Sequence, residues 1–223
     1  MIRDVISNDG YVISSLLSLL IILIVKKINR RRFSDLIRLF ANSNYLRIYL
    51  KEHRFLDIFD FILFLNFIIN CTTYTYILYG SFINLIEINT NKFAAISIAF
   101  TIFLVLKLIL KLLTGYLFDL HKTISILIFQ QVSTINFIGI MLLPINLLLV
   151  FGLNFDIRWI IISVVLIATT ILIGMLKTIQ TNLNFVLSNF LYFILYICTL
   201  EIGPYVIIYD QLKNYNYLQH LIL

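Results

Sequence analysis

Six long runs of mainly apolar residues constrain the fold of this sequence more than any other feature. They cover about residues 11–25, 57–79, 93–113, 133–151, 158–176 and 185–209. An α-helix needs roughly 20 apolar residues to cross a bilayer, so the short first run must borrow flanking residues to span. With 61% hydrophobic and 13% charged residues, the chain has too few polar groups to cover a water-soluble core. We therefore predict an all-α, polytopic membrane protein, a single transmembrane domain over residues 1–223 with about six spans.

The basic residues are divided unevenly between the two ends of these predicted spans. If the runs alternate in direction, most of the 17 Lys and Arg residues fall on one side, and Arg3, Lys92, Arg158 and Lys213 fall on the other. Cytoplasmic loops of membrane proteins carry the excess of Lys and Arg. The expected topology therefore has both termini outside the cytoplasm.

The segment 26–54 is polar and strongly basic, and its apolar residues Phe33, Leu36, Ile37 and Phe40 recur at helical spacing. This pattern predicts an amphipathic helix on the cytoplasmic membrane surface, with its cations toward anionic lipid headgroups. The same charges also suit a topology determinant with no further role. We expect no nucleic-acid partner, because the segment lies beside a bilayer and contains no recognition motif.

Charged residues of the second and third runs form the main candidate site. Lys107 and Lys111 lie one turn apart on one face of the third run, whereas Asp57 and Asp60 open the second run at a similar depth. Because intramembrane charges are usually paired, we expect Asp57 or Asp60 to contact Lys111 in a mainly structural ion pair. The alternative is a site for the phosphate of a lipid headgroup. The candidate residues for either role are Lys107, Lys111, His121, Lys122, Asp57 and Asp60.

Other polar or helix-breaking residues interrupt the apolar runs. Asn66 and Asn70 lie one turn apart and are expected to bond a neighbouring helix. Glu201 precedes a Gly-Pro pair in the sixth run, which makes it a candidate intramembrane carboxylate. Pro144 predicts a kink in the fourth run. Residues 116–130 are expected to form a short helix along the cytoplasmic surface.

Motifs of enzymes and metal sites are absent from the sequence. It contains no HExxH, GxSxG, Walker loop or cysteine–histidine cluster. His53, His121 and His220 are far apart, and the last is expected on the opposite side of the membrane, so a metal site is not expected. Cys71 and Cys198 lie in separate apolar runs and are interpreted as packing residues. We therefore assign no catalytic residue, metal or cofactor, and the sequence favours a protein that is not an enzyme.

Two segments resemble a known family. They are residues 115–151, GYLFDLHKTISILIFQQVSTINFIGIMLLPINLLLVF, and residues 190–205, FLYFILYICTLEIGPY. They are similar to a family of small polytopic membrane proteins of Bacteroidota that is catalogued as a domain of unknown function, and the resemblance covers nearly the whole chain. It implies residence in the bacterial cytoplasmic (inner) membrane and brings no established activity. In that membrane, the charge asymmetry described above predicts both termini in the periplasm.

Three classes of function remain open at this point. The first is a structural or accessory subunit that packs against other membrane-protein subunits of the cell envelope. The second is a lipid-handling protein or enzyme that binds a phosphorylated headgroup at the lysines of the third run. The third is a small transporter that uses Glu201, which is least supported because no inverted repeat accompanies that carboxylate.

Overall fold

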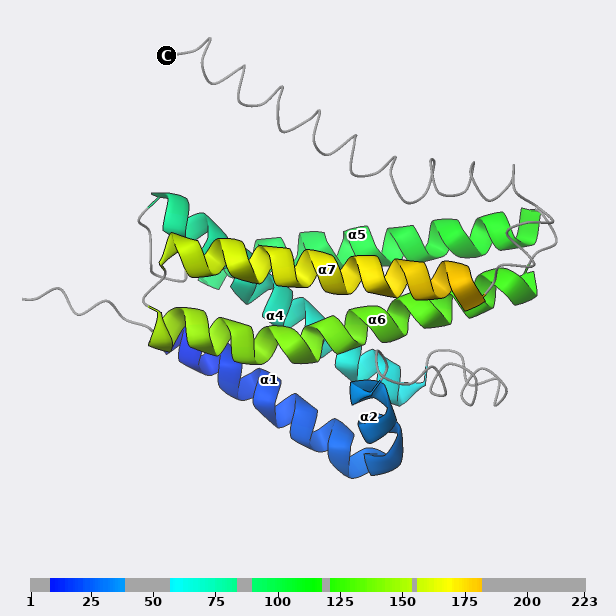
Figure 1. Cartoon of the computed structure of the whole chain (residues 1–223), viewed down its shortest axis with the longest axis horizontal. Coiled ribbons are helices and arrows are strands. Elements are labelled where there is room, and N and C mark those ends of the chain that lie inside the picture. Colours follow the sequence, from blue (N-terminus) through cyan, green and yellow to red (C-terminus); the bar gives the residue numbers. More distant parts are fainter. Residues whose placement is uncertain (1–8, 39–56, 84–89, 118–120, 154–155, 182–223) are drawn as a thin grey trace, which may run out of the picture.

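The computed structural model is a bundle of helices (Figure 1), and it describes residues 9–38, 57–83, 90–117, 121–153 and 156–181. In chain order the elements are α1 (Asp9–Ile28), α2 (Arg30–Ile37), α4 (Ile58–Ile83), α5 (Thr90–Leu117), α6 (His121–Leu147), the π-helix η1 (Leu148–Gly152) and α7 (Ile157–Thr181). No strand occurs in these ranges. The all-α class predicted from the sequence is therefore confirmed.

Five of the described helices are long and apolar enough to cross a membrane. They are α1, α4, α5, α6 continued by η1, and α7. The chain is thus a polytopic α-helical membrane protein. The expected sixth span at residues 185–209 and the part of the basic segment at residues 39–54 lie outside the described residues.

The predicted surface helix at residues 116–130 is not a separate element, which corrects the expectation from the sequence. Its first residues end α5, and its last ten open the continuous helix α6. The reason is apolar spacing, because Ile124, Ile128 and Val132 are buried together against α5. Gln130 is also buried. The polar residues before the predicted fourth span, from His121 on, are therefore part of the long helix α6.

The spans alternate in direction, so that the ends of α1, α5 and α7 and the beginnings of α4 and α6 lie together at one end of the bundle (Figure 1). Helix α2 turns back from α1 at this end and runs across the spans toward the beginning of α4. We call it the basic end, because its residues include Lys26, Lys27, Arg30, Arg31, Arg32, Arg38, Lys107, Lys111, Lys122 and Lys177. The opposite end carries Lys92 and Arg158.

Helix α4 is the central span, because it is the most buried of the five and packs against α1, α5 and α6. Its most extensive contact is with α6, which runs in the same direction (Figure 1). A Cβ atom added to Gly139 of α6 would lie 2.8 Å from Cα of Phe67 on α4. The ring of Phe67 in turn lies 6.4 Å from that of Phe100 on α5. A glycine is therefore required where the two backbones meet.

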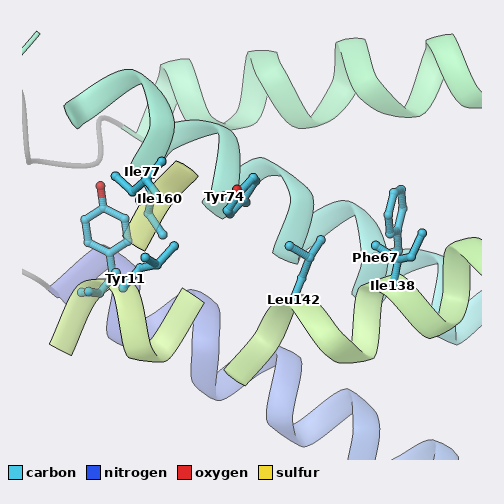
Figure 2. Packing of buried hydrophobic residues seen from close by; sticks show 9 residues of the cluster. Tyr11, Phe67, Tyr74, Ile77, Ile138, Leu142 and Ile160 are labelled. Carbon is cyan, nitrogen blue, oxygen red and sulfur yellow. The ribbon is translucent and has the colours of Figure 1, made fainter. Parts of the chain in front are cut away.

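Two clusters of buried apolar residues hold these helices together. Figure 2 shows the larger one, which draws on α1, α4, α6, η1 and α7 and contains Tyr11, Phe67, Tyr74, Ile77, Ile138, Leu142, Leu149, Val150 and Ile160. The second attaches α2 to α1, α4 and α6 and contains Val25, Phe33, Leu36, Phe59, Leu63 and Phe129. Helix α2 therefore packs into the bundle with one side and is exposed on the other.

Pro144 lies inside α6 and removes one backbone donor from its hydrogen-bond ladder. The helix continues to Leu147 and then changes to η1, after which the N–H of Leu153 donates to the backbone oxygen of Leu148 at 2.9 Å. Turns of π-helix inside α-helices are frequent at functional sites. This turn begins two residues after a buried polar residue, Asn146.

The substitution Gly139→Ala tests the close approach of α4 and α6. The added methyl group would meet the Phe67 backbone, and such overpacking is expected to lower the free energy of unfolding by about 1–3 kcal/mol. Unfolding by SDS in mixed micelles measures this change. Gly152→Ala is the matched control, because its added Cβ would lie 3.8 Å from Cδ2 of Leu148. Equal effects of the two substitutions would contradict the described packing.

Candidate functional site

A buried arginine of α2 joins two carboxylates at the beginning of α4. Nη1 of Arg32 donates to Oδ2 of Asp57 at 3.1 Å, and Nη2 donates to Oδ2 of Asp60 at 2.7 Å. The side chains of Arg32 and Asp60 are 3% and 1% exposed, whereas that of Asp57 is 35% exposed. The charge of Asp60 is thus compensated inside the protein, while Asp57 reaches the surface.

The sequence around Arg32 directs its side chain into the bundle. Oδ1 of Asn29 caps α2 by accepting the backbone N–H of Arg32 at 3.1 Å. The neighbouring residues Phe33 and Leu36 are buried on the same side of the helix. The guanidinium of Arg32 also lies over the ring of Phe59, 4.7 Å from its centroid, where the ring attracts the cation. Capping, apolar packing and charge therefore fix one rotation of α2.

Asn136 of α6 completes this group at the buried carboxylate. Its Nδ2 lies 3.4 Å from Oδ1 and 3.5 Å from the backbone oxygen of Asp60. Its Oδ1 is buried and has no hydrogen-bond partner among the described residues, although buried polar atoms are usually bonded. We call the four residues Arg32, Asp57, Asp60 and Asn136 the arginine cluster.

The ion pair expected between the aspartates and Lys111 is not formed. Within the described part of the chain, Asp57 and Asp60 pair with Arg32. Lys111 of α5 instead donates to Oε1 of Gln131 on α6. The physical reason is that α5 turns Lys111 toward α6, while α2 folds back over the beginning of α4 and supplies the cation. The aspartates are thus in a buried ion pair that the sequence did not predict, with Arg32 in place of Lys111.

The structure places the remaining predicted site residues separately. Lys107 lies one turn before Lys111 on α5 and is 5% exposed, and Lys111 is 2% exposed. His121 and Lys122 are the first residues of α6, at the basic end. Glu201 lies outside the described residues. The binding of a lipid phosphate by this set stays a prediction.

A second polar group, which we call the polar seam, joins α1, α4 and α6 nearer the middle of the bundle; it consists of Ser18, Asn66, Asn70 and Asn146. Oγ of Ser18 donates to Oδ1 of Asn66 at 2.7 Å, and Nδ2 of Asn70 donates to Oγ of Ser18 at 2.6 Å. Nδ2 of Asn146 donates to the backbone oxygen of Asn70 at 3.0 Å. These contacts confirm that Asn66 and Asn70 bond a neighbouring helix.

The arginine cluster and the polar seam together fix the register of α4 against α6. Asn136 contacts Asp60, and Asn146 contacts Asn70, and each pair is separated by 76 residues in sequence. Equal separations are expected of two parallel helices that pack without slipping, because both helices rise about 1.5 Å per residue. The two asparagines of α6 therefore fix the same register of α6 against α4 at two positions along the helices.

A small cavity adjoins the polar seam on the side away from the basic end. It offers about 10 Å³ to the centre of a water-sized sphere, which is the room for one water molecule. Its lining residues are Tyr11, Ser14, Ser15, Asn70, Thr73, Asn146, Leu147, Val150 and Phe151. Oδ1 of Asn146 is buried and has no hydrogen-bond partner among the described residues. The cavity suits a bound water and is too small for a lipid headgroup.

Sequence reasoning missed four members of these groups. Ser18, Asn136 and Asn146 each interrupt an apolar run, which is the signal that did identify Asn66. Arg32 gave no such signal, because it is one of several adjacent arginines that look alike in the sequence. The described residues contain no group of three or more His, Cys, Asp and Glu side chains that could hold a metal ion.

Comparison with known proteins places the chain in a family. A family model described as a domain of unknown function (DUF4271) matches residues 11–212. The chain belongs to this family. Neither curated proteins nor solved structures give a significant match. Membership in DUF4271 confirms the resemblance seen in the sequence and assigns no activity to the arginine cluster or the polar seam.

The substitution Arg32→Gln tests the arginine cluster of this DUF4271 chain. Loss of the guanidinium leaves the carboxylate of Asp60 buried and uncompensated, which is expected to lower the free energy of unfolding by about 3–5 kcal/mol. Adding Asp60→Asn to the same chain should recover part of this loss, because the buried charge is then absent. Arg31→Gln is the control, since Arg31 is exposed on the same helix. SDS unfolding of the wild type, the two single variants Arg32→Gln and Asp60→Asn, and the double variant measures the coupling, and additive losses would contradict the pairing.

A double-mutant cycle with Ser18→Ala and Asn70→Ala tests the polar seam. Hydrogen bonds between membrane helices are worth about 0.6 kcal/mol on average and up to about 1.7 kcal/mol. A coupling energy in this range is expected in SDS unfolding, because Ser18 accepts a bond from Asn70. Ser15→Ala replaces Ser18→Ala in the control cycle, since the Ser15 hydroxyl donates within α1, to the backbone oxygen of Val12. Coupling of Asn70 to Ser15 as strong as to Ser18 would contradict the described contact.

Proposed function

We propose that this chain is a structural or accessory subunit of a membrane assembly in the bacterial cell envelope. Support comes from one observation: several polar side chains inside its spans bond to other helices of the same chain. Ser18 joins α1 to α4, Asn146 joins α6 to α4, and Oγ of Ser163 lies 2.8 Å from the hydroxyl of Tyr74 and joins α7 to α4. Bonds of this kind hold one arrangement of helices, as a scaffold requires.

The outer faces of α5 and α7 are the proposed contact surfaces for a partner subunit. Large apolar side chains are exposed on both helices, among them Ile98, Ile102, Ile109, Ile161, Val165 and Leu172. Ala95 and Ala99 of α5 are exposed one turn apart. Small residues at this spacing allow the backbone of a second membrane helix to approach closely. The proposed partner is therefore another integral membrane protein.

The proposed orientation puts the basic end in the cytoplasm and both chain termini in the periplasm. The positive-inside rule supports it, because short cytoplasmic segments carry the excess of Lys and Arg. Within the described residues, the cations gather at the end that holds α2, and Lys92 and Arg158 lie at the other. The bacterial inner membrane is proposed from the family resemblance.

A lipid-handling role is the second candidate, supported by the burial of Lys107 and Lys111 one turn apart inside α5. Two cations held in an apolar environment suit a headgroup phosphate. A phosphate would first have to displace Gln131, which accepts the bond from Lys111. A phospholipid retained in native mass spectrometry, and lost in the chain with Lys107→Ala and Lys111→Ala, would favour this role over the accessory one. Transport through Glu201 would be set aside if Glu201→Gln leaves ion flux unaltered.

Purification of the tagged chain from native membranes in mild detergent tests the accessory role. We expect a second membrane protein in stoichiometric amount. Ala95→Trp on α5 should strongly reduce its recovery, because a bulky side chain blocks close helix approach. Leu23→Trp is the control, since Leu23 is exposed on α1, and Figure 1 shows most of α1 on the other side of α6 from α5 and α7. Recovery of the chain alone at native expression would contradict the proposal.

A further inference from the structure

The basic residues around α2 are divided by the fold into two groups with different surroundings. Arg32 is buried and paired with the carboxylates of α4. The other basic residues of this part of the chain are exposed, and they are Lys26, Lys27, Arg30, Arg31 and Arg38. We call these five the basic face. A run that looks uniform in the sequence thus contains one structural arginine and five cations that point outward.

The rotation of α2 turns the three arginines of the basic face outward. At about 100° per residue, Arg30, Arg31 and Arg38 fall within an arc of about 100°. Phe33 and Leu36 lie on the opposite side and are buried against the bundle. The bonds of Arg32 to α4 hold this rotation, so the three exposed arginines stay on one side of the helix. A face organised in advance binds with less loss of conformational entropy.

The basic face also lies level with the ends of the membrane-spanning helices, where lipid headgroups are expected. Lys26 and Lys27 are in the last turn of the membrane-spanning helix α1. Helix α2 packs beside Phe59 and Leu63, in the first turns of the membrane-spanning helix α4. Ile37 is exposed beside the cations. Exposed apolar and basic side chains together are typical of helices that lie in the membrane interface.

The charge of the region is strongly positive. Between residues 26 and 38 the sequence contains six basic residues and one acidic residue, Asp35. Because Arg32 is neutralised by the aspartates of α4, the surplus of positive charge remains on the basic face. Anionic phosphates at the surface of a membrane are the complementary groups within reach.

From this geometry we propose that the basic face binds the phosphate groups of anionic phospholipids in the leaflet at the basic end. This goes beyond a role in setting the topology, because it requires an equilibrium preference for anionic over zwitterionic lipid in the folded chain. The preference is a property of the chain alone. It does not depend on whether the chain has a partner subunit.

Native mass spectrometry of the delipidated full chain in detergent tests this inference. The chain is titrated with phosphatidylglycerol or phosphatidylcholine, and we expect phosphatidylglycerol to bind about tenfold more tightly or better. The variant with Arg30→Gln, Arg31→Gln and Arg38→Gln should lose most of this preference. The triple substitution of the same arginines by Lys should retain it, because the charge is kept.

The matched control carries Lys92→Gln and Arg158→Gln, which remove exposed cations from the opposite end of the bundle. It should keep the wild-type preference. Raising the salt concentration should lower the preference of the wild-type chain, and this measurement needs no variant to fold.

Three results would overturn the inference: no preference in the wild-type chain, an equal preference in the glutamine variant, or an equal loss in the opposite-end control. If the glutamine variant keeps the lipid preference but no longer recovers a partner subunit from membranes, the basic face contacts protein instead. Unfolding midpoints in SDS show whether each variant is folded. A glutamine variant that does not fold leaves the salt response and the lysine variant to decide.

Discussion

The ion pair between Arg32 and Asp60 determines how the basic end of this bundle is built. A charge buried near a membrane is tolerated when a partner compensates it, and each of these residues compensates the other at 2.7 Å. Because Arg32 is on α2 and Asp60 on α4, the pair ties a surface helix to the central span. Together with the Asn29 cap and the burial of Phe33 and Leu36, this contact sets the rotation of α2 and turns its remaining arginines outward.

The centre of the bundle depends on a different interaction, in which amide and hydroxyl groups bond across helices. Between membrane helices apolar surface gives little drive for association, since lipid is equally apolar, so close packing and hydrogen bonds become decisive. Helix α4 uses both. Gly139 of α6 leaves room for the backbone of α4. Asn70 donates a hydrogen bond to Ser18 on α1 and accepts one from Asn146 on α6. A bundle held in this way keeps its shape while its outer faces remain available to lipid or to another subunit.

Much of this fold follows from the sequence, because apolar runs of spanning length leave a membrane protein few alternatives. The bonding of Asn66 to a neighbouring helix was also predictable, since an amide inside an apolar run must find a partner. The identity of its partner, Ser18, was not predictable. Arg32 and Lys111 carry the same charge. Which of them reaches Asp60 depends on how α2 folds back over α4, and no local sequence pattern predicts that. The surface helix expected at residues 116–130 was wrong for a related reason: Ile124, Ile128 and Val132 pack against α5, and residues 121–130 are part of α6.

The central claim is that polar residues inside the spans bind α1 to α4 within the membrane. Cross-linking in intact membranes tests it directly, in a chain with Cys71→Ser and Cys198→Ser that carries Ser18→Cys and Asn66→Cys. A short bifunctional thiol reagent should join the two positions efficiently, because their side chains are in direct contact at 2.7 Å. A second chain with Leu19→Cys in place of Ser18→Cys should react poorly, since Leu19 is exposed on another side of α1. Equal cross-linking of both chains, or none in the first, would contradict the account.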